Sequence, residues 1–298
     1  MIELDSVSFS YGSNGGAVEA VSDLDLRLED GSFVAVIGSN GCGKSTFAKL
    51  LNAILVPSKG TVRVDGLDTR DPSNIYAIRS KVGLVFQNPD NQLVSDTVED
   101  DIVFGLENMG LPRHEMEVRL EETLSLTGLT PLRHCSPDRL SGGQKQLVAI
   151  AGILAMRPKC IVLDEATSML DPAGRAMVLG LCHDLNERLG MTIVLVTHYM
   201  DECIDAHRIV AMDRGVVRLD GTPSQVFARA DELKALGVGL PIATELSEGL
   251  IARGIGLPHG ILTGEELCRE LLSLKSSKGH GFSNDHESRK DHGGCRND

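Results

Sequence analysis

The sequence predicts an α/β fold with a mainly parallel core sheet. Three apolar runs have the composition of strands buried in such a sheet, and they begin the segments FVAVI (33–37), CIVLDE (160–165) and TIVLVTH (192–198). A helix-like stretch, DPAGRAMVLGLCHDLNERL, lies between the last two runs, and this strand–helix–strand order favours parallel pairing. Residues of chemical interest end each run: GSNGCGKST, DE and TH. Because ligand sites in such sheets lie at the carboxyl ends of the strands, we expect one site there.

Further strands are predicted where polar and apolar residues alternate or a run ends in a turn, at IELDSVSFSY (2–11), SDLDLRLED (22–30) and TVRVDG (61–66). A helix is predicted at 113–127, because Met116, Leu120 and Leu124 recur at helical spacing.

Composition and charge narrow the class of protein. The net charge of -13 over 298 residues argues against a basic surface for nucleic acid or anionic lipid. No run approaches the roughly 18 apolar residues that span a bilayer, and the N-terminus does not have the pattern of a signal peptide. The seven cysteines are scattered without a C-x-x-C, which fits a reducing compartment. We therefore expect a soluble cytoplasmic protein that binds no nucleic acid.

The character of the chain changes after about residue 222. Residues 223–275 hold short helical stretches broken by GVGLP and GIGLP, and 276–298 is predicted to be a disordered tail. His280, His286, His292 and Cys295 of the tail could bind a transition metal. A solvated tail is the simpler interpretation, because this histidine spacing matches no standard ligand spacing.

The segment after the first run predicts a nucleoside triphosphate site. Gly38, Gly43, Lys44 and Ser45 match the P-loop pattern G-x-x-x-x-G-K-[ST], between a strand and a helix. Glycines let backbone N–H groups surround an anion, and the helix N-terminus adds its dipole. Lys44 supplies charge for the β- and γ-phosphates, and the hydroxyl of Ser45 can bind Mg²⁺.

The other two runs supply candidate catalytic groups. Asp164 can hold the hydration shell of Mg²⁺, and Glu165 can orient or deprotonate an attacking water. His198 can contact the γ-phosphate. The alternatives are a solvated acid at a strand end for Glu165 and a structural role for His198.

A second phosphate-binding loop is predicted at LSGGQ (140–144), which precedes the helical QKQLVAIAGILAM. Either the chain binds two nucleotides, or it offers this loop to a nucleotide held by another subunit. A plain helix N-cap is the third possibility.

With these motifs the sequence resembles, over about residues 1–222, the ATPase subunits of ATP-binding-cassette (ABC) transporters. Tyr11 falls where that family stacks an aromatic ring on adenine, Gln87 matches its glutamine loop, and LSGGQ matches its signature. SMLD (168–171) matches its D-loop and His198 its switch histidine. The resemblance implies a P-loop NTPase fold of the ABC ATPase type, with an antiparallel β subdomain, a helical subdomain inserted at about 88–160 and a small C-terminal helical extension.

The resemblance also implies a head-to-tail dimer, with ATP and Mg²⁺ at the interface. The implied catalytic residues are Lys44, Gln87, Glu165 and His198, and the implied Mg²⁺ residues are Ser45, Gln87 and Asp164. The implied ATP-binding residues are Tyr11, Gly38, Ser39, Asn40, Gly41, Cys42, Gly43, Lys44, Ser45 and Thr46, completed by Ser141, Gly142, Gly143 and Gln144 of the other subunit.

A finer resemblance, over about 1–275, is to the A1-type ATPases of energy-coupling-factor transporters, in the segments 86–112, 164–172 and 232–246. It implies a peripheral protein at the cytoplasmic face of the membrane, paired with a second ATPase on a transmembrane T component that contacts a substrate-binding S component, for uptake of vitamins or metal ions. The segment from Gln87 to Gly110 is the expected docking surface. The alternatives are the ATPase of another importer or exporter, a soluble non-transport cassette and a non-hydrolysing subunit, which the intact Glu165 and His198 disfavour.

Two residues depart from the family pattern. Cys42 stands where serine is usual, and Leu147 stands where arginine is usual, which puts one contact of the signature helix in doubt. We expect the amides of the P-loop to lower the pKa of the Cys42 thiol, so that alkylation inactivates the ATPase and ATP protects it. A buried, inert thiol is the alternative.

Overall fold

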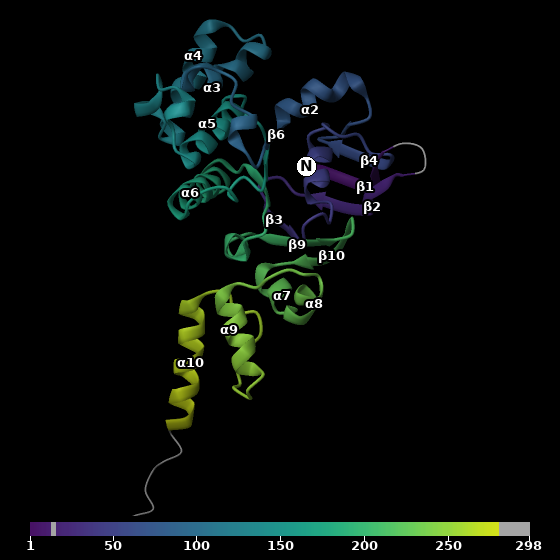
Figure 1. The fold of residues 1–298 in the computed structure, drawn as a ribbon, viewed down its shortest axis with the longest axis vertical. Coiled ribbons are helices and arrows are strands. Elements are labelled where there is room, and N and C mark those ends of the chain that lie inside the picture. The colour runs from purple at the N-terminus through teal and green to yellow at the C-terminus, as the bar shows by residue number, and fades with distance from the viewer. Residues whose placement is uncertain (13–15, 280–298) are drawn as a thin grey trace, which may run out of the picture.

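The computed structural model describes residues 1–12 and 16–279, with side chains to residue 275. Figure 1 shows two sheets and their helices in the upper part of the molecule and a group of C-terminal helices below them. Within the described residues, no helix is both long and apolar enough to cross a membrane.

The central sheet has six strands in the order β10-β9-β3-β8-β7-β6. Its strands are β3 (Phe33–Gly38), β6 (Val82–Val85), β7 (Cys160–Asp164), β8 (Thr192–Val196), β9 (Arg208–Asp213) and β10 (Val216–Gly221). All neighbours pair in parallel except β9 and β10. The mainly parallel core sheet is therefore confirmed, and the three apolar runs are the adjacent strands β3, β8 and β7.

The apolar runs form strands because both faces of this sheet are covered. Alternate residues of β3 face different cores. Phe33 and Ala35 join one, the main core, with α5 (Gly142–Ala155) and α6 (Pro172–Leu189). Val34 and Val36 join another with α1 (Lys44–Leu51) and β1 (Ile2–Tyr11). A strand buried on both faces needs apolar residues at every position, which explains an unbroken run rather than an alternating one.

The second sheet is antiparallel and has the order β2-β1-β4-β5. Its strands are β1 (Ile2–Tyr11), β2 (Val18–Leu28), β4 (Lys59–Val64) and β5 (Leu67–Asp68). The predicted antiparallel β subdomain is thus present, and β1 ends at Tyr11.

Helices α3, α4 and α5 follow β6 in the sequence and pack against one another before the chain enters β7 (Figure 1). The helices before residue 222 are α1 (Lys44–Leu51), α2 (Ile75–Lys81), α3 (Val98–Asn108), α4 (Arg113–Thr127), α5 (Gly142–Ala155) and α6 (Pro172–Leu189). Short 3-10 turns lie at η1 (Pro72–Asn74), η2 (Pro89–Asn91), η3 (Thr130–Leu132), η4 (Pro137–Arg139) and η5 (Met200–Cys203). The helix predicted at 113–127 is α4.

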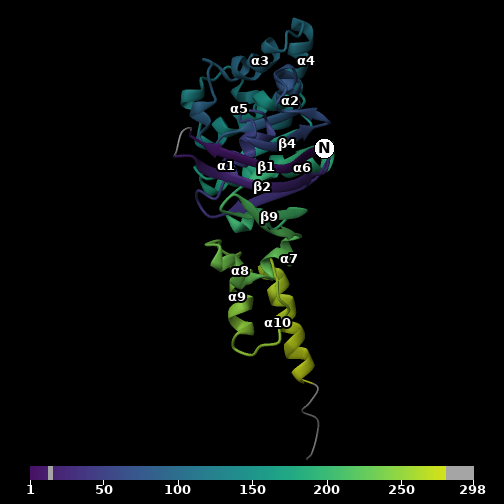
Figure 2. The same cartoon turned by 90° about the vertical axis from the view of Figure 1, so that its right-hand side faces the viewer.

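The C-terminal helices divide into two packing groups. They are α7 (Pro223–Phe227), α8 (Ala230–Ala235), α9 (Ile242–Ile251) and α10 (Gly264–Gly279). Phe227, Leu233 and Val238 belong to the core that β3 shares with α5 and α6, so α7 and α8 pack against the central sheet and its helices. Helices α9 and α10 lie side by side around a separate small core (Figure 2). Helix α10 continues through 276–279, and the rest of the predicted tail, with its histidines and Cys295, lies outside the described residues.

Candidate functional site

The P-loop turns sharply between β3 and α1, and its glycines are required by both conformation and space. Gly43 has φ +107°, and a Cβ there would lie 2.2 Å from the carbonyl oxygen of Ala20. A Cβ on Gly38 would lie 2.4 Å from the carbonyl oxygen of Met212. No L side chain fits these positions without movement of the backbone. Gly43 also precedes the first residue of α1 without a side-chain cap, so the helix N-terminus is open to an anion.

Lys44 is held in place by the P-loop itself. It is only 5% exposed, and its Nζ donates to the carbonyl oxygens of Gly38 at 2.9 Å and Ser39 at 3.0 Å. The third neighbour of Nζ is the sulfur of Cys42 at 4.0 Å, a weak acceptor. The ammonium therefore sits inside the loop with capacity for a stronger acceptor such as a phosphate oxygen.

The hydroxyl of Ser45, at the start of α1, meets the carboxylate of Asp164, at the end of β7. The Oγ of Ser45 donates to Oδ1 of Asp164 at 2.9 Å. Burial raises the pKa of Asp164, whereas the hydrogen bond from Ser45 lowers it. Both groups are oxygen donors of the kind that Mg²⁺ takes in combination with phosphates and water, so the pair fits a Mg²⁺ ion.

Gln87, Glu165 and His198 converge from the ends of three neighbouring strands, β6, β7 and β8. The Nε2 of Gln87 lies 3.4 Å, and the Nδ1 of His198 3.8 Å, from Oε2 of Glu165. Gln87 also donates to the Oγ of Ser168 at 3.0 Å. Glu165 has φ +52°, a left-handed conformation that costs a non-glycine residue about 1–2 kcal/mol. Such strain at the carboxylate that the sequence singles out is typical of functional sites. In this structure Gln87 points to Glu165 and Ser168 rather than to the Ser45–Asp164 pair.

A cavity of about 400 Å³ joins the P-loop to these groups. Its lining residues are Gly38, Ser39, Asn40, Gln87, Glu165, His198, Met200, Gly237, Val238 and Gly239. The last three belong to the loop after α8, and the sequence offered no sign of their place at the site. From the sequence, their GVGLP segment is expected only to interrupt helices. The loop returns to the P-loop because Val238 packs into the main core, a long-range contact that a local pattern does not reveal.

Tyr11 lies beside the P-loop at the end of β1. Its hydroxyl is 3.2 Å from Oγ1 of Thr46, and 45% of the residue is exposed. Phe9 contacts it edge to face. The ring is therefore fixed by neighbours and still open to stack on a base.

The signature loop is held differently. Ser141 caps α5 and forms a reciprocal capping box with Gln144. A Cβ on Gly143 would lie 2.7 Å from the Cα of Gly174, so α5 and α6 approach too closely for any side chain there. None of the residues Ser141 to Gln144 lines the cavity at the P-loop of the same chain. Leu147, at the position where arginine is usual, is buried in the main core.

The expected lowering of the Cys42 pKa is wrong, and the alternative of a buried thiol fits the structure. Burial raises the pKa of its thiol, and the opposing effects of Lys44, by charge and by its backbone N–H, are smaller. Cys42 is 4% exposed. Desolvation of the thiolate therefore outweighs the neighbouring amides and the positive charge, which the sequence pattern could not weigh.

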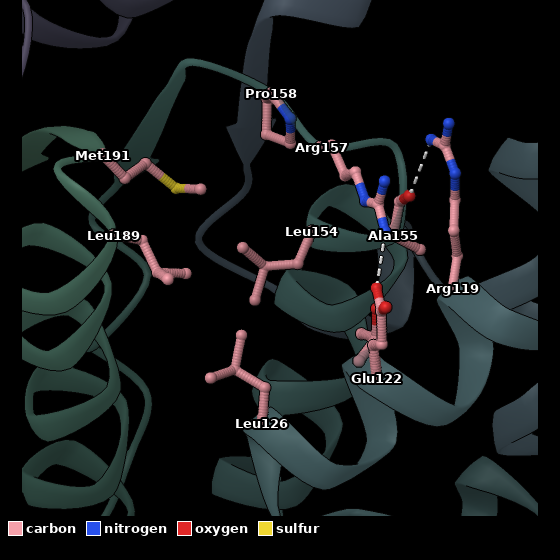
Figure 3. Close-up of a pocket in the computed structure, with 10 residues that line it drawn as sticks. Arg119, Glu122, Leu126, Leu154, Ala155, Arg157, Pro158, Leu189 and Met191 are labelled. Atoms are coloured by element: carbon pink, nitrogen blue, oxygen red, sulfur yellow. Dashed lines mark hydrogen bonds and ion pairs between the residues drawn. The ribbon is translucent and has the colours of Figure 1, made fainter.

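A second cavity, of about 420 Å³, lies far from the phosphate site, beside residues at the amino ends of β7 and β8 (Figure 3). Leu126, Leu154 and Met191 give it apolar walls. Arg157 pairs with Glu122 at its edge. It brings together none of the predicted site residues.

This fold and site define an ATP-binding cassette, and comparison with known proteins agrees. The family described as "ABC transporter" matches residues 21–168. The chain belongs to the ABC transporter family and is an ATPase of that class.

Within the family, the chain is similar to the energy-coupling factor transporter ATP-binding proteins called EcfA1. It is 51% identical to the EcfA1 protein of Symbiobacterium thermophilum, over 92% of this chain and 98% of that protein. Among solved structures, it matches cbiO1 of Clostridium perfringens, described as part of the ABC transporter complex cbiONQ, with a TM-score of 0.71 and 35% identity over 83% of this chain and 98% of that one. It also matches the dimeric cassette MJ0796 bound to ADP and Pi, with a TM-score of 0.68 and 30% identity over 74% of this chain and 98% of that one.

Proposed function

We propose that the chain hydrolyses ATP to energise a membrane importer of the energy-coupling factor type, for vitamins or transition-metal ions. The observation that carries this proposal is the convergence of the P-loop residues 38–40 with Glu165 and His198 on one cavity, while a second phosphate-binding loop lies outside that cavity. The relatives named for energy-coupling factor transporters support the transport system. Residues 1–222 form the cassette, with a helical subdomain at about 88–160, and residues 223–275 are an accessory region.

Each site residue has a role that its position supports. Lys44 binds the β- and γ-phosphates, and Tyr11 stacks on adenine. Ser45 and Asp164 would hold Mg²⁺, and Gln87, whose Nε2 donates to Ser168 here, would join them only with its side chain turned toward the pair. When bound, Mg²⁺ neutralises charge on the β- and γ-phosphates.

Glu165 orients the attacking water and accepts its proton, because its carboxylate lies at the end of β7 inside the cavity. His198 and Gln87 hold Glu165, since both lie within 4 Å of its Oε2 atom. They contact the γ-phosphate as well, because both line the same cavity as the P-loop. Phosphoryl transfer needs this positioning and charge stabilisation rather than covalent catalysis.

The second loop belongs to the site of another subunit. Ser141, Gly142, Gly143 and Gln144 close over an ATP molecule held by the P-loop of a second ATPase subunit, in a head-to-tail dimer. The dimeric cassette among the similar structures supports the pairing of two cassettes. ATP closes the dimer, and hydrolysis reopens it.

The docking surface for a transmembrane T component is a groove of about 210 Å³ between α3, α5 and the loop before α3. Val94 and Phe104 expose apolar surface there, 65% and 49% respectively. Asp101 also lines the groove: its Oδ1 accepts from the backbone of Val94 and Ser95, and its buried Oδ2 has no hydrogen-bond partner in the described chain. An apolar partner segment would cover the exposed side chains of this groove, and one N–H donor or cation on it would pair with Oδ2 of Asp101. An S component would then join through the T component, with the ATPase peripheral at the cytoplasmic face.

The base assignment is tested by Glu165→Gln, which keeps the size of the side chain and removes its proton-accepting charge. We expect ATP binding to persist, turnover to fall at least 100-fold, and a closed dimer to accumulate in ATP on size-exclusion chromatography. Glu187→Gln, an exposed position on α6, is the matched control and should behave like wild type. Turnover of Glu165→Gln close to wild type would refute the assignment.

The transport system is tested by purifying the chain from its own membranes in mild detergent and identifying what accompanies it. A second cassette ATPase with T and S components supports the proposal. A pair of substrate-specific permeases would make it the ATPase of another ABC importer or exporter. Phe104→Asp should release the T component, whereas Val118→Asp, which is similarly exposed on α4, should not.

A further inference from the structure

Glu202 is a buried carboxylate to which the proposed mechanism gives no role. It lies in η5, directly after the segment of His198, and its side chain is 3% exposed. An unpaired carboxylate at such a position would cost several kcal/mol, so its partners are informative.

One oxygen of Glu202 joins the loops that follow β7 and β8. Oε2 accepts a hydrogen bond from Oγ1 of Thr167 at 3.0 Å and another from Oγ1 of Thr197 at 2.5 Å. Thr167 stands two residues after Glu165, and Thr197 directly precedes His198. Both threonines are 1% exposed, so water does not compete for these hydrogen bonds.

The other oxygen faces Arg175 of α6. Oε1 lies 3.4 Å from Nε of Arg175, and neither atom has a hydrogen-bond partner in the described chain. The guanidinium of Arg175 lies 3.7 Å above the ring of Tyr199, whose ring centre is 4.2 Å from that of His198. The buried carboxylate thus connects three elements around His198: the loop after β7, the loop after β8, and α6.

We propose that Glu202 is a positioning residue for ATP hydrolysis, which fixes the loop of Glu165 relative to the loop of His198. This inference rests on the proposed roles of those two residues. The ends of β7 and β8 set where the loops begin, but Glu165 has a strained φ of +52° and lies 3.8 Å from His198 across two separate loops. The two threonine hydrogen bonds to one carboxylate oxygen hold this spacing. A displacement of about 1 Å in a catalytic group can cost 100-fold in rate, so we expect the loss of these hydrogen bonds to lower kcat.

The primary test is Glu202→Gln in the full chain, which keeps the shape of the side chain and removes its charge. We expect kcat for ATP hydrolysis to fall about 10- to 100-fold while KM for ATP and the melting temperature stay close to wild type. Asp201→Asn changes the exposed neighbouring acid of the same turn and should leave kcat within twofold.

Paired threonine variants separate positioning from packing. Thr197→Ser and Thr167→Ser keep the hydroxyl and should retain kcat, whereas Thr197→Val and Thr167→Val keep the volume, lose the hydrogen bond to Glu202 and should lower kcat. Thr167→Val is the cleaner variant, because the hydroxyl of Thr197 also accepts from the backbone N–H of Tyr199 at 3.0 Å. The double variant Glu202→Gln, Thr197→Val should be no slower than the slower single variant, because both changes break one unit.

Three outcomes would overturn the inference: a wild-type kcat in Glu202→Gln, equal losses in the serine and valine variants, or strictly additive losses in the double variant. The proposed base is judged separately in the same preparations. Wild-type turnover of Glu165→Gln rejects the role of Glu165, whereas an inactive Glu165→Gln beside a fully active Glu202→Gln rejects only the role of Glu202.

Discussion

The P-loop and the signature loop both bring glycines to the N-terminus of a helix, yet their surroundings differ. In the P-loop, Lys44 and Ser45 have partners within the same chain, and α1 begins without a side-chain cap. In the signature loop, Ser141 and Gln144 satisfy the start of α5 themselves, while Ser141 and Gly142 remain exposed. The P-loop is equipped to surround an anion alone. The signature loop presents a capped, polar end outward, which fits the proposed role at the ATP of another subunit.

The packing around each loop reinforces this difference. The P-loop is enclosed by strand ends, and its cavity collects groups from β6, β7 and β8. The signature loop is fixed from behind by the close approach of Gly143 to Gly174, and a further hydrogen bond from the Gly174 N–H to Asp171 caps α6. In the proposed dimer, the P-loop of one chain and the signature loop of the other contact the same ATP molecule from opposite sides.

The largest effect is expected at the P-loop, from Lys44→Ala. The change removes a buried positive charge that faces the phosphates, so ATPase activity should fall by about 10²–10³-fold and nucleotide binding by the single chain should weaken as well. Phosphate release and a fluorescent nucleotide titration measure the two effects. Lys59→Ala, an exposed lysine at the start of β4, should keep both within twofold. Activity of Lys44→Ala within threefold of wild type would refute the proposed role of Lys44 in binding the phosphates.

The signature loop should show the opposite pattern in Ser141→Asp. Aspartate is as good a helix cap as serine, so stability should hold, but its charge repels the γ-phosphate of the partner's ATP. We expect turnover to fall at least 30-fold while the single chain still binds ATP. Thr222→Asp also introduces aspartate at the N-cap of a capping box, that of α7, and should leave turnover intact.

A mixture of the two variants tests which chain supplies each loop of a site. In a head-to-tail dimer of one Lys44→Ala chain and one Ser141→Asp chain, one of the two sites has both loops intact. The mixture should therefore recover ATPase activity that neither variant has alone. A mixture that stays inactive, although the chains still associate, would mean that both loops of a site come from the same chain.

The sequence predicted those parts of the molecule that depend on local pattern. Strands β3, β7 and β8 and helix α4 follow from runs and periods, and the P-loop follows from a motif between a strand and a helix. The sequence did not predict which strands are neighbours of β3, or that Gly237 and Gly239 line the phosphate cavity, because both depend on long-range packing. It also could not set the pKa of Cys42, which is a balance of burial against charge.

A smaller effect is expected at the signature helix from Leu147→Arg, which introduces the residue that is usual in the family. Leu147 is 4% exposed in the main core, so a charged side chain there should lower the free energy of unfolding by about 1–3 kcal/mol. ATPase activity per folded molecule should stay within twofold. Urea denaturation measures the first effect, and Leu147→Met, which conserves volume, is the control. A gain in turnover for Leu147→Arg would mean that leucine costs this chain a functional contact.

The smallest effect on activity is expected at Cys42. The exposed Cys268 should react with iodoacetamide at least about 10-fold faster at pH 7.5, because burial of Cys42 restricts access and raises the pKa of its thiol. Because burial raises its pKa, the Cys42 thiol keeps its proton to higher pH in the folded chain than in the unfolded chain. Alkylation of Cys42 should therefore accelerate above the ordinary thiol range, where ionisation of this thiol also begins to favour unfolding. Peptide mass spectrometry of timed samples measures both rates.

Cys42→Ser should retain kcat and KM within twofold, since Lys44 keeps its two carbonyl partners without the sulfur. Rapid alkylation of Cys42 at neutral pH, blocked by ATP, would instead show that the P-loop amides outweigh burial.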